Sequence, residues 1–158
     1  MISFSVTGIE KAQAKLEALA DVLQAESRRF VDRATAESLD RAKVYTSLTD
    51  HTLKELAALG HPYARRFAPN TLHPDHVVHA QSGTLTSGLH QETFEAGNSR
   101  IIGVVRNEVW YDRFIQLGTW KMRPRPYMSH VLQELGPGFI EAIRHIVSDA
   151  VRVVSGRA

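Results

Sequence analysis

The feature that most constrains the fold is a long run, residues 9–59, that contains no glycine and no proline. Its first part carries apolar side chains at spacings of three and four, which places them on one face of a helix. These residues are Ile9, Ala12, Leu16, Leu19 and Leu23. The stripe breaks near Glu26 and resumes out of phase at Phe30. The pattern predicts one long helix that ends near Tyr45, with residue 26 as the point where it would kink or split.

Shorter elements are predicted on either side of this helix. Residues 2–6 alternate apolar and polar side chains, which is the period of a half-buried strand. A second helix is predicted over about residues 49–59, because Gly60 and Pro62 stop it. From Thr84 the period changes, and TLTSGLHQETFEA and RIIGVVRNEVW predict two strands joined by a turn at AGNS.

Helical patterns return after the strands. YDRFIQLG fits a short helix stopped by Gly118, and YMSHVLQEL starts another, which Gly136-Pro137-Gly138 would break or kink. The closing segment FIEAIRHIVSDAVRVV is amphipathic, with Ile140, Ile143, Val147, Ala150, Val151 and Val154 on one side. The predicted class is therefore α+β: a small antiparallel β-sheet core flanked by a long N-terminal helix and a C-terminal helix.

Composition sets the outer limits. A chain of 158 residues fits a single domain, 1–158, and a formal charge of +2 permits but does not indicate a nucleic-acid partner. The absence of cysteine excludes disulfides and thiolate metal sites. No apolar run approaches the ~18 residues of a membrane span. The N-terminus lacks the charged and apolar regions of a secretory signal, so we expect the chain to stay in the compartment where it is made.

Motifs for catalysis and cofactor binding are absent from the sequence. It contains no GxxxxGK[ST], GxSxG, HExxH or GxGxxG, and we predict a protein that is not an enzyme and takes no cofactor. The best candidate for a metal site is HPDHVVH, where His73, Asp75, His76 and His79 are ligand types that zinc accepts. Their spacing matches no metal-binding motif, and a polar loop is the preferred interpretation of this segment.

The densest basic and aromatic run is IQLGTWKMRPRPYM, residues 115–128. A nucleic-acid interface would place Lys121, Arg123 and Arg125 on phosphates and the aromatic rings on bases. A protein interface would use the same residue types, since Trp, Tyr, Met and Arg are enriched there. A third interpretation is a surface loop whose Trp120 and Tyr127 fold back onto the core. The prolines fix φ and pre-order an extended loop, which favours docking over catalysis.

The segment YDRFIQLGTWKMRPRPYM resembles a motif of the tail-completion, or neck, protein family of long-tailed bacteriophages. Members carry a tyrosine, an apolar helical turn, Gly-Thr, a small residue, Lys-Met, two variable residues, Arg-Pro and an aromatic residue. The matching positions are Tyr111, Gly118, Thr119, Lys121, Met122, Arg125, Pro126 and Tyr127. Gln116 and Trp120 depart from the pattern, which often has an acidic and a small residue there.

Two further segments are similar to parts of the same family and occur in the same order. ISFSVTGIEKAQAKLEAL is similar to its opening strand, glycine and amphipathic helix, and QSGTLTSGL is similar to the segment that starts its central strands. Residues at about 48–82, with the second helix and the His-rich loop, are atypical of the family. The resemblance implies a structural virion protein at the head–tail junction.

Such proteins assemble as a ring, typically six-fold, between the head connector and the tail tube, and DNA passes through the lumen. The implied partners are further copies of this chain, a head-connector or stopper protein, a tail-tube or tail-terminator protein and transiting double-stranded DNA, with no membrane. The implied partner interface comprises Tyr111, Gly118, Thr119, Trp120, Lys121, Met122, Arg123, Arg125, Pro126 and Tyr127. Trp120, Met122 and Tyr127 would anchor it, with the cations as complementary charge. The alternative function is a nucleic-acid-binding module that uses the same basic aromatic loop, residues 118–127.

Overall fold

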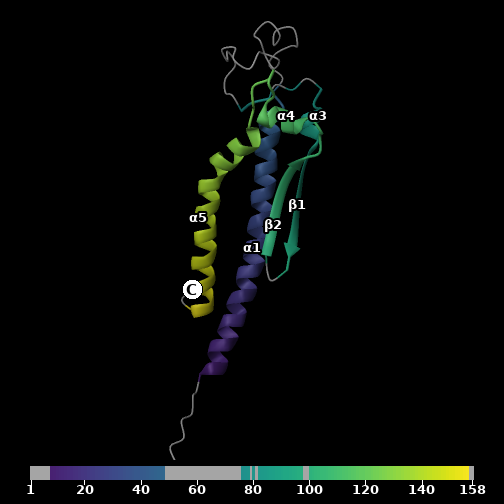
Figure 1. Cartoon of the computed structure of the whole chain (residues 1–158). Coiled ribbons are helices and arrows are strands. Elements are labelled where there is room, and N and C mark those ends of the chain that lie inside the picture. The colour runs from purple at the N-terminus through teal and green to yellow at the C-terminus, as the bar shows by residue number, and fades with distance from the viewer. Residues whose placement is uncertain (1–7, 49–75, 79, 81, 98–99, 157–158) are drawn as a thin grey trace, which may run out of the picture.

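Two long helices and a β-hairpin make up most of the structure, a computed structural model that describes residues 8–48, 76–78, 80, 82–97 and 100–156 (Figure 1). The elements are α1 (Ile9–Thr46), α3 (Thr84–Ser87), β1 (Leu89–Ala96), β2 (Arg100–Asn107), α4 (Asp112–Leu117) and α5 (Tyr127–Ser155). Helix α5 runs beside α1, and the hairpin lies along the second half of α1 (Figure 1). The predicted α+β class is confirmed. The predicted strand at 2–6 and the second helix lie outside the described residues.

Helix α1 is one continuous helix, so the predicted split near residue 26 does not occur, and its predicted end near Tyr45 is confirmed. Its packed face changes along its length. In the second half the buried positions are small: Thr35, Ser38, Ala42 and Thr46. All three hydroxyls among them donate to the carbonyl four residues earlier: Thr35 to Val31, Ser38 to Ala34 at 2.7 Å and Thr46 to Ala42 at 3.0 Å. Small, internally bonded side chains let the hairpin and α5 approach this half of the helix.

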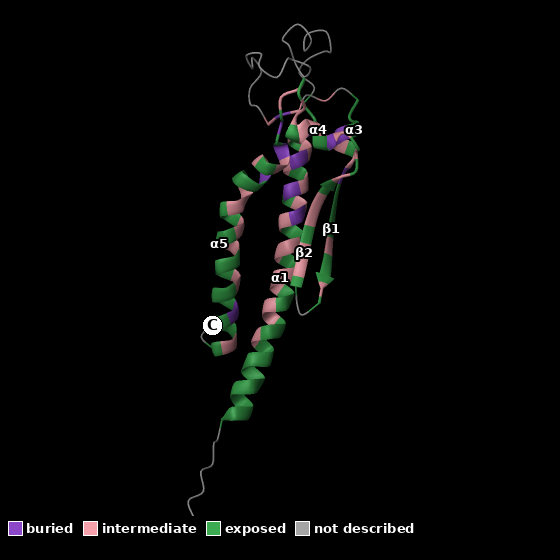
Figure 2. Ribbon diagram, in the orientation of Figure 1, coloured by how far each residue is buried: buried purple, intermediate pink, exposed green. Residues whose placement is uncertain are grey.

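The first half of α1 behaves differently, because the start of its apolar stripe is exposed and Leu19 and Leu23 are only half-buried. The side chain of Leu16 is 67% exposed, and Ile9 is also exposed. Figure 2 shows that this end of α1 carries exposed residues nearly throughout. The Arg28–Glu95 ion pair, 3.2 Å from nitrogen to oxygen, marks the level at which the hairpin ends. The helix therefore extends well past the hairpin (Figure 1).

The hairpin pairs in antiparallel register from Leu89 opposite Asn107 to Ala96 opposite Arg100. Gly103 sits where β2 crosses α1. A Cβ at that position would lie 2.8 Å from Val31 and 2.9 Å from Thr35, so glycine is needed for this close approach.

One stretch predicted as strand is helical. Residues Thr84–Ser87 form the short helix α3, and β1 begins only at Leu89. Gly83 turns the chain with a left-handed φ of 74°. Thr86 then donates from its hydroxyl to the carbonyl oxygen of Thr46 at 2.7 Å. This bond to the end of α1 competes successfully with the strand preference of the threonines.

Gly136-Pro137-Gly138 was predicted to break or kink the C-terminal segment. Helix α5 continues through Pro137, so the break does not occur, and the helix is bent (Figure 1). This stretch of α5 contacts α1. The ring of Phe139, which follows Gly138, packs edge to face on Phe30 with 5.9 Å between ring centres. The apolar side predicted for the last segment is confirmed only in part as a packed face. Ala150 is buried, whereas Ile140, Ile143, Val147 and Val151 are exposed.

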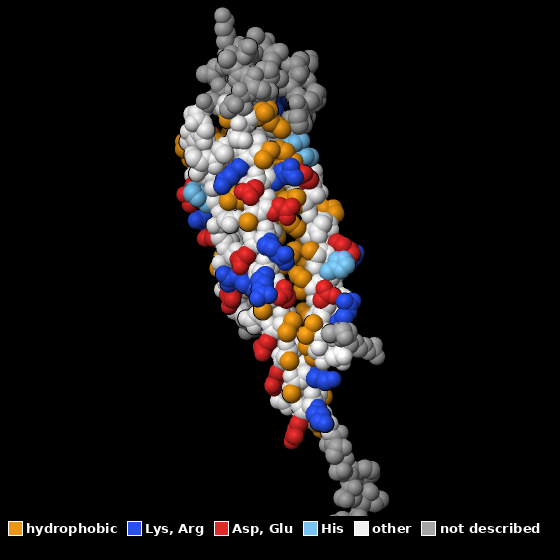
Figure 3. Space-filling model, turned by 180° about the vertical axis from the view of Figure 1, so that it is seen from behind, with side chains coloured by type: hydrophobic (Ala, Val, Ile, Leu, Met, Phe, Trp, Pro, Cys, Tyr) orange, Lys and Arg blue, Asp and Glu red, His pale blue; other side chains and the backbone are white. Residues whose placement is uncertain are grey.

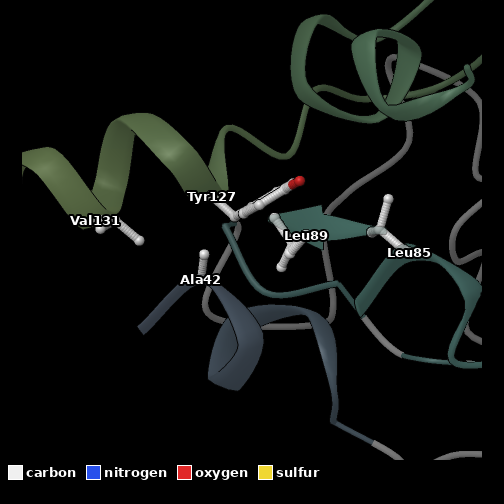
Figure 4. Packing of buried hydrophobic residues seen from close by; sticks show 5 residues of the cluster. All are labelled: Ala42, Leu85, Leu89, Tyr127 and Val131. Atoms are coloured by element: carbon white, nitrogen blue, oxygen red, sulfur yellow. The ribbon is translucent and has the colours of Figure 1, made fainter. Parts of the chain in front are cut away.

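The buried core is small and lies at one end of the molecule. It consists of Ala42, Leu85, Leu89, Tyr127 and Val131, contributed by α1, α3, β1 and the start of α5 (Figure 4). This cluster joins the ends of four elements, and the loop before α5 enters it through Tyr127.

Candidate partner-docking loop

Tyr127 ends the loop and is fully buried in the core. Its hydroxyl donates to Asp112 Oδ1 at 2.6 Å and accepts from Asn107 Nδ2 at 3.2 Å. The same Asn107 nitrogen donates to the carbonyl oxygen of Leu85 at 2.9 Å. Burial, together with the hydrogen bond to Asp112, raises the pKa of Tyr127 above its ordinary value of 10.0. One phenol thus ties the loop to β2, α3 and α4.

Arg125 is the second buried residue of the loop. Its side chain donates to the carbonyl oxygen of Val77 at 3.1 Å, and its backbone N–H donates to that of Ile115 at 2.7 Å. The guanidinium is therefore committed to the chain's own backbone. An interior position gives this cation a structural role.

Gly118 shapes the start of the loop. Its φ of 73° is left-handed, and a Cβ there would lie 2.7 Å from the backbone nitrogen of Pro124. The adjacent turn is closed by Thr119, whose N–H donates to the carbonyl oxygen of Met122 at 2.9 Å. The Thr119 hydroxyl accepts from the N–H groups of Lys121 at 3.2 Å and of Met122 at 3.0 Å. These bonds hold the backbone of residues 118–124 in one conformation without a strand partner.

The tip of this turn presents an aromatic ring to solvent. The side chain of Trp120 is 76% exposed, and the Lys121 ammonium lies 4.3 Å from the centre of its ring. That distance is typical of a cation–π contact. A large apolar face with a positive charge beside it is thus displayed on a fixed turn.

The ten residues implied as a partner interface are divided by the structure. Exposed are Trp120, Lys121 and Pro126; half-buried are Tyr111, Gly118, Thr119, Met122 and Arg123; buried are Arg125 and Tyr127. The role of the loop in binding stays a prediction. The expectation that Tyr127 anchors a partner meets a physical obstacle, because this ring is already enclosed by the chain's own core.

Sequence reasoning missed an apolar group beside the loop. Trp110 is as exposed as Trp120, and its ring lies edge to face with those of Tyr111 and Phe114, at 5.7 and 6.1 Å between centres. Leu117, at the end of α4, is also exposed. The available signal was the segment VWYDRF, where a short helix too small to bury every apolar residue follows a strand.

The metal candidates are only partly described. His73, Asp75 and His79 lie outside the described residues. The ring of His76 stacks on that of His130 with 3.4 Å between centres and meets Tyr45 edge to face at 4.7 Å. Within the described ranges, no group of three or more His, Cys, Asp or Glu residues could hold a metal ion.

The fold and the loop together define an α+β protein in which a hairpin and two long helices support a fixed turn with an exposed tryptophan. No helix in the described part of the chain is both long and apolar enough to cross a membrane. Comparison with known proteins finds no match to a family model, to a curated protein or to a solved structure.

Proposed function

We propose that this chain is a structural virion protein of the head–tail junction of a long-tailed bacteriophage, where it forms a ring that joins the head connector to the tail tube. The family resemblance of residues 111–127 motivates the proposal. The observation that carries it is the division of the loop into a buried base, Arg125 and Tyr127, and an exposed tip, Trp120 and Lys121. The base fixes the tip, and the tip is the part that meets a partner.

A pre-ordered tip suits permanent assembly. Association is opposed by the entropy of ordering loops and side chains at an interface. The turn at Gly118 and Thr119 is already closed by its own hydrogen bonds, so little backbone entropy is left to lose on docking. A rigid tryptophan is also the residue type most enriched among the energetic centres of interfaces.

The distribution of apolar surface also supports assembly. Exposed large apolar side chains occur on both long helices and around α4, among them Leu16, Leu132, Ile143, Trp110 and Trp120. Soluble monomers rarely expose extended apolar patches, and such patches mark contact sites. An isolated copy of this chain would leave much of that surface in water, whereas a ring of copies would cover part of it.

Charge favours a protein partner over a nucleic acid at the loop. Arg125 is buried on a backbone carbonyl, and Lys121 lies over Trp120, so the three cations of the loop do not form one exposed basic stripe. Phosphate-driven binding to duplex DNA would weaken by about 0.9 log units per contact for each tenfold rise in salt. We expect no such steep dependence from the purified chain. A slope that corresponds to several contacts would favour the nucleic-acid function.

The test is electron microscopy of lysates from a phage that lacks this gene, complemented with variants. The proposal expects DNA-filled heads and separate tails of normal length without the gene, and restored particles with the unaltered chain. Trp120→Ala should restore few joined particles. Arg144→Ala, a change at an exposed charged side chain of α5 outside the loop and outside the apolar surface, serves as the control and should restore them. Intact infectious particles without the gene would overturn the proposal.

A further inference from the structure

A groove runs between α1, β2 and α5, away from the loop. It encloses about 500 Å³. Its lining is largely apolar and includes Phe30, Ala34, Val105, Val131, Leu132 and Phe139. Seen from behind the view of Figure 1, hydrophobic side chains follow one another along the long axis of the molecule (Figure 3). The chain leaves this space open between three of its elements.

One wall of the groove is a free strand edge. Among the described residues β2 pairs with β1 alone, so the opposite edge of β2 has no strand beside it. Gly103, Val104 and Val105 of β2 line the groove, which places that edge along it. A free edge offers backbone N–H and C=O groups to an incoming extended segment, and pockets beside it select the side chains of that segment.

The chain carries a segment of matching chemistry at residues 2–6, ISFSV. In an extended conformation Ile2, Phe4 and Val6 share one face, and the two serines share the other. Three apolar side chains could then enter the groove while the serines face water. A strand of this length spans about 17 Å at 3.4 Å per residue.

The segment cannot reach the groove of its own chain. Helix α1 begins at Ile9, and the nearest groove residue on it is Phe30, 21 residues further along (30 − 9), or about 32 Å at 1.5 Å per residue. Ile2 is seven residues from Ile9 (9 − 2), so an extended chain carries it at most about 25 Å. Val6 can travel only about 11 Å by the same measure. To dock as a strand, most of residues 2–6 would have to lie inside the groove. The chain between these residues and Ile9 is too short to allow this.

We propose that residues 2–6 of a second copy dock as a strand on the free edge of β2, with Ile2, Phe4 and Val6 in the groove. This inference rests on the proposed ring. In a ring each copy would give its N-terminal segment to one neighbour and receive that of the other, which is a heterologous contact that closes on itself. The projecting half of α1 carries the segment away from its own body to that neighbour.

The occupant can be identified by photocrosslinking with the full-length chain. A benzophenone side chain replaces Leu132, an exposed residue that lines the groove, and a matched control carries it at Val153, an exposed residue of the same helix that does not line it. Mixing isotopically labelled and unlabelled copies before irradiation distinguishes links between copies from links within one. We expect links from position 132, but not from position 153, to residues 2–6 of another copy. Links to residues 2–6 of the same copy, to any other segment of the chain or to α5 of a neighbour would overturn the inference.

A second pair of variants tests the alternation of the segment. Phe4→Asp places a charge in the groove, whereas Ser5→Asp places the same charge on the opposite, solvent-facing side. Self-association measured by sedimentation should weaken at least about tenfold for Phe4→Asp and little for Ser5→Asp. Equal assembly of both variants and the unaltered chain would overturn the inference and leave the proposed ring standing. An unaltered chain that stays monomeric at every concentration would overturn the inference together with the self-assembly on which it rests.

Discussion

Tyr127 donates a hydrogen bond to Asp112 over 2.6 Å, and both side chains are buried. The pair links the first turn of α5 to the first turn of α4 across the loop that both helices enclose. The geometry of the candidate docking loop therefore depends in part on one phenol and one carboxylate that are buried within the chain's own fold.

The first prediction is that Tyr127→Phe destabilises the chain. The ring still fills the core, but Asp112 loses a donor and Asn107 an acceptor inside the protein. Leaving buried polar groups unsatisfied costs about 1–3 kcal/mol, measurable by urea unfolding. Tyr45→Phe, which removes a hydroxyl bonded to Glu134 at an exposed site, is the control and should cost clearly less. Equal losses would contradict the role given to the buried pair.

The second prediction concerns alkaline pH. Because folding raises the pKa of Tyr127, the unfolded chain loses this proton first as pH rises. The contribution is fully present below the ordinary value of 10.0 and declines above it, by up to about 1.4 kcal/mol per pH unit. The difference in unfolding free energy between the unaltered chain and Tyr127→Phe should shrink between about pH 9 and 12. A difference that stays constant over this range would show that Tyr127 is not the responsible group.

The third prediction compares two glycines. Gly118→Ala forces a Cβ to within 2.7 Å of the Pro124 nitrogen at a left-handed φ, so we expect a loss of about 1–3 kcal/mol in unfolding free energy. Gly138→Ala lies inside α5, does not precede a proline, and its added Cβ meets nothing within 4 Å. It should stabilise the chain by about 0.5–1 kcal/mol. The same chemical change should thus have opposite signs at the two sites. Two changes of the same sign, measured by thermal unfolding, would refute the account of the turn.

The fourth prediction separates folding from docking at Trp120. Because this side chain is exposed and its main contact is Lys121, Trp120→Ala should change the unfolding free energy by less than about 0.5 kcal/mol. Joined particles should nevertheless fall sharply in the complementation assay. Circular dichroism melts and particle counts on the same variant give both quantities. A variant that unfolds easily would make Trp120 part of the core instead of a contact residue.

The sequence predicted the elements with strong periodicity and missed those that tertiary contacts decide. The apolar spacing and the absence of glycine and proline predicted α1 to within a residue of its end. The segment TLTS was predicted as strand but is helical. It follows a left-handed Gly83, and Thr86 donates a hydrogen bond to the end of α1. The predicted break at Pro137 did not occur: the helix is continuous there, and Phe139, two residues further on, packs on Phe30 of α1.

At the loop, composition identified the segment but not which of its residues are buried and which are exposed. Arg123 and Arg125 have the same chemistry and neighbouring prolines, yet the structure buries Arg125 on the carbonyl of Val77. That carbonyl is 48 positions away in the chain, and no local pattern shows that the two meet. The exposed Trp110 escaped notice for a related reason, since only the finished fold shows that α4 is too short to cover it.

The unbroken first half of α1 has one further consequence. A continuous helix has a length and a rotation that are fixed by its number of residues, since each residue adds about 1.5 Å of length and about 100° of rotation. The number of residues between Ile9 and Phe30 therefore sets the distance from the body of one copy to the point where its N-terminal segment begins. In the proposed ring, adding or removing whole turns there would change the spacing of neighbouring copies in steps of about 5.4 Å, and with it the diameter of the ring.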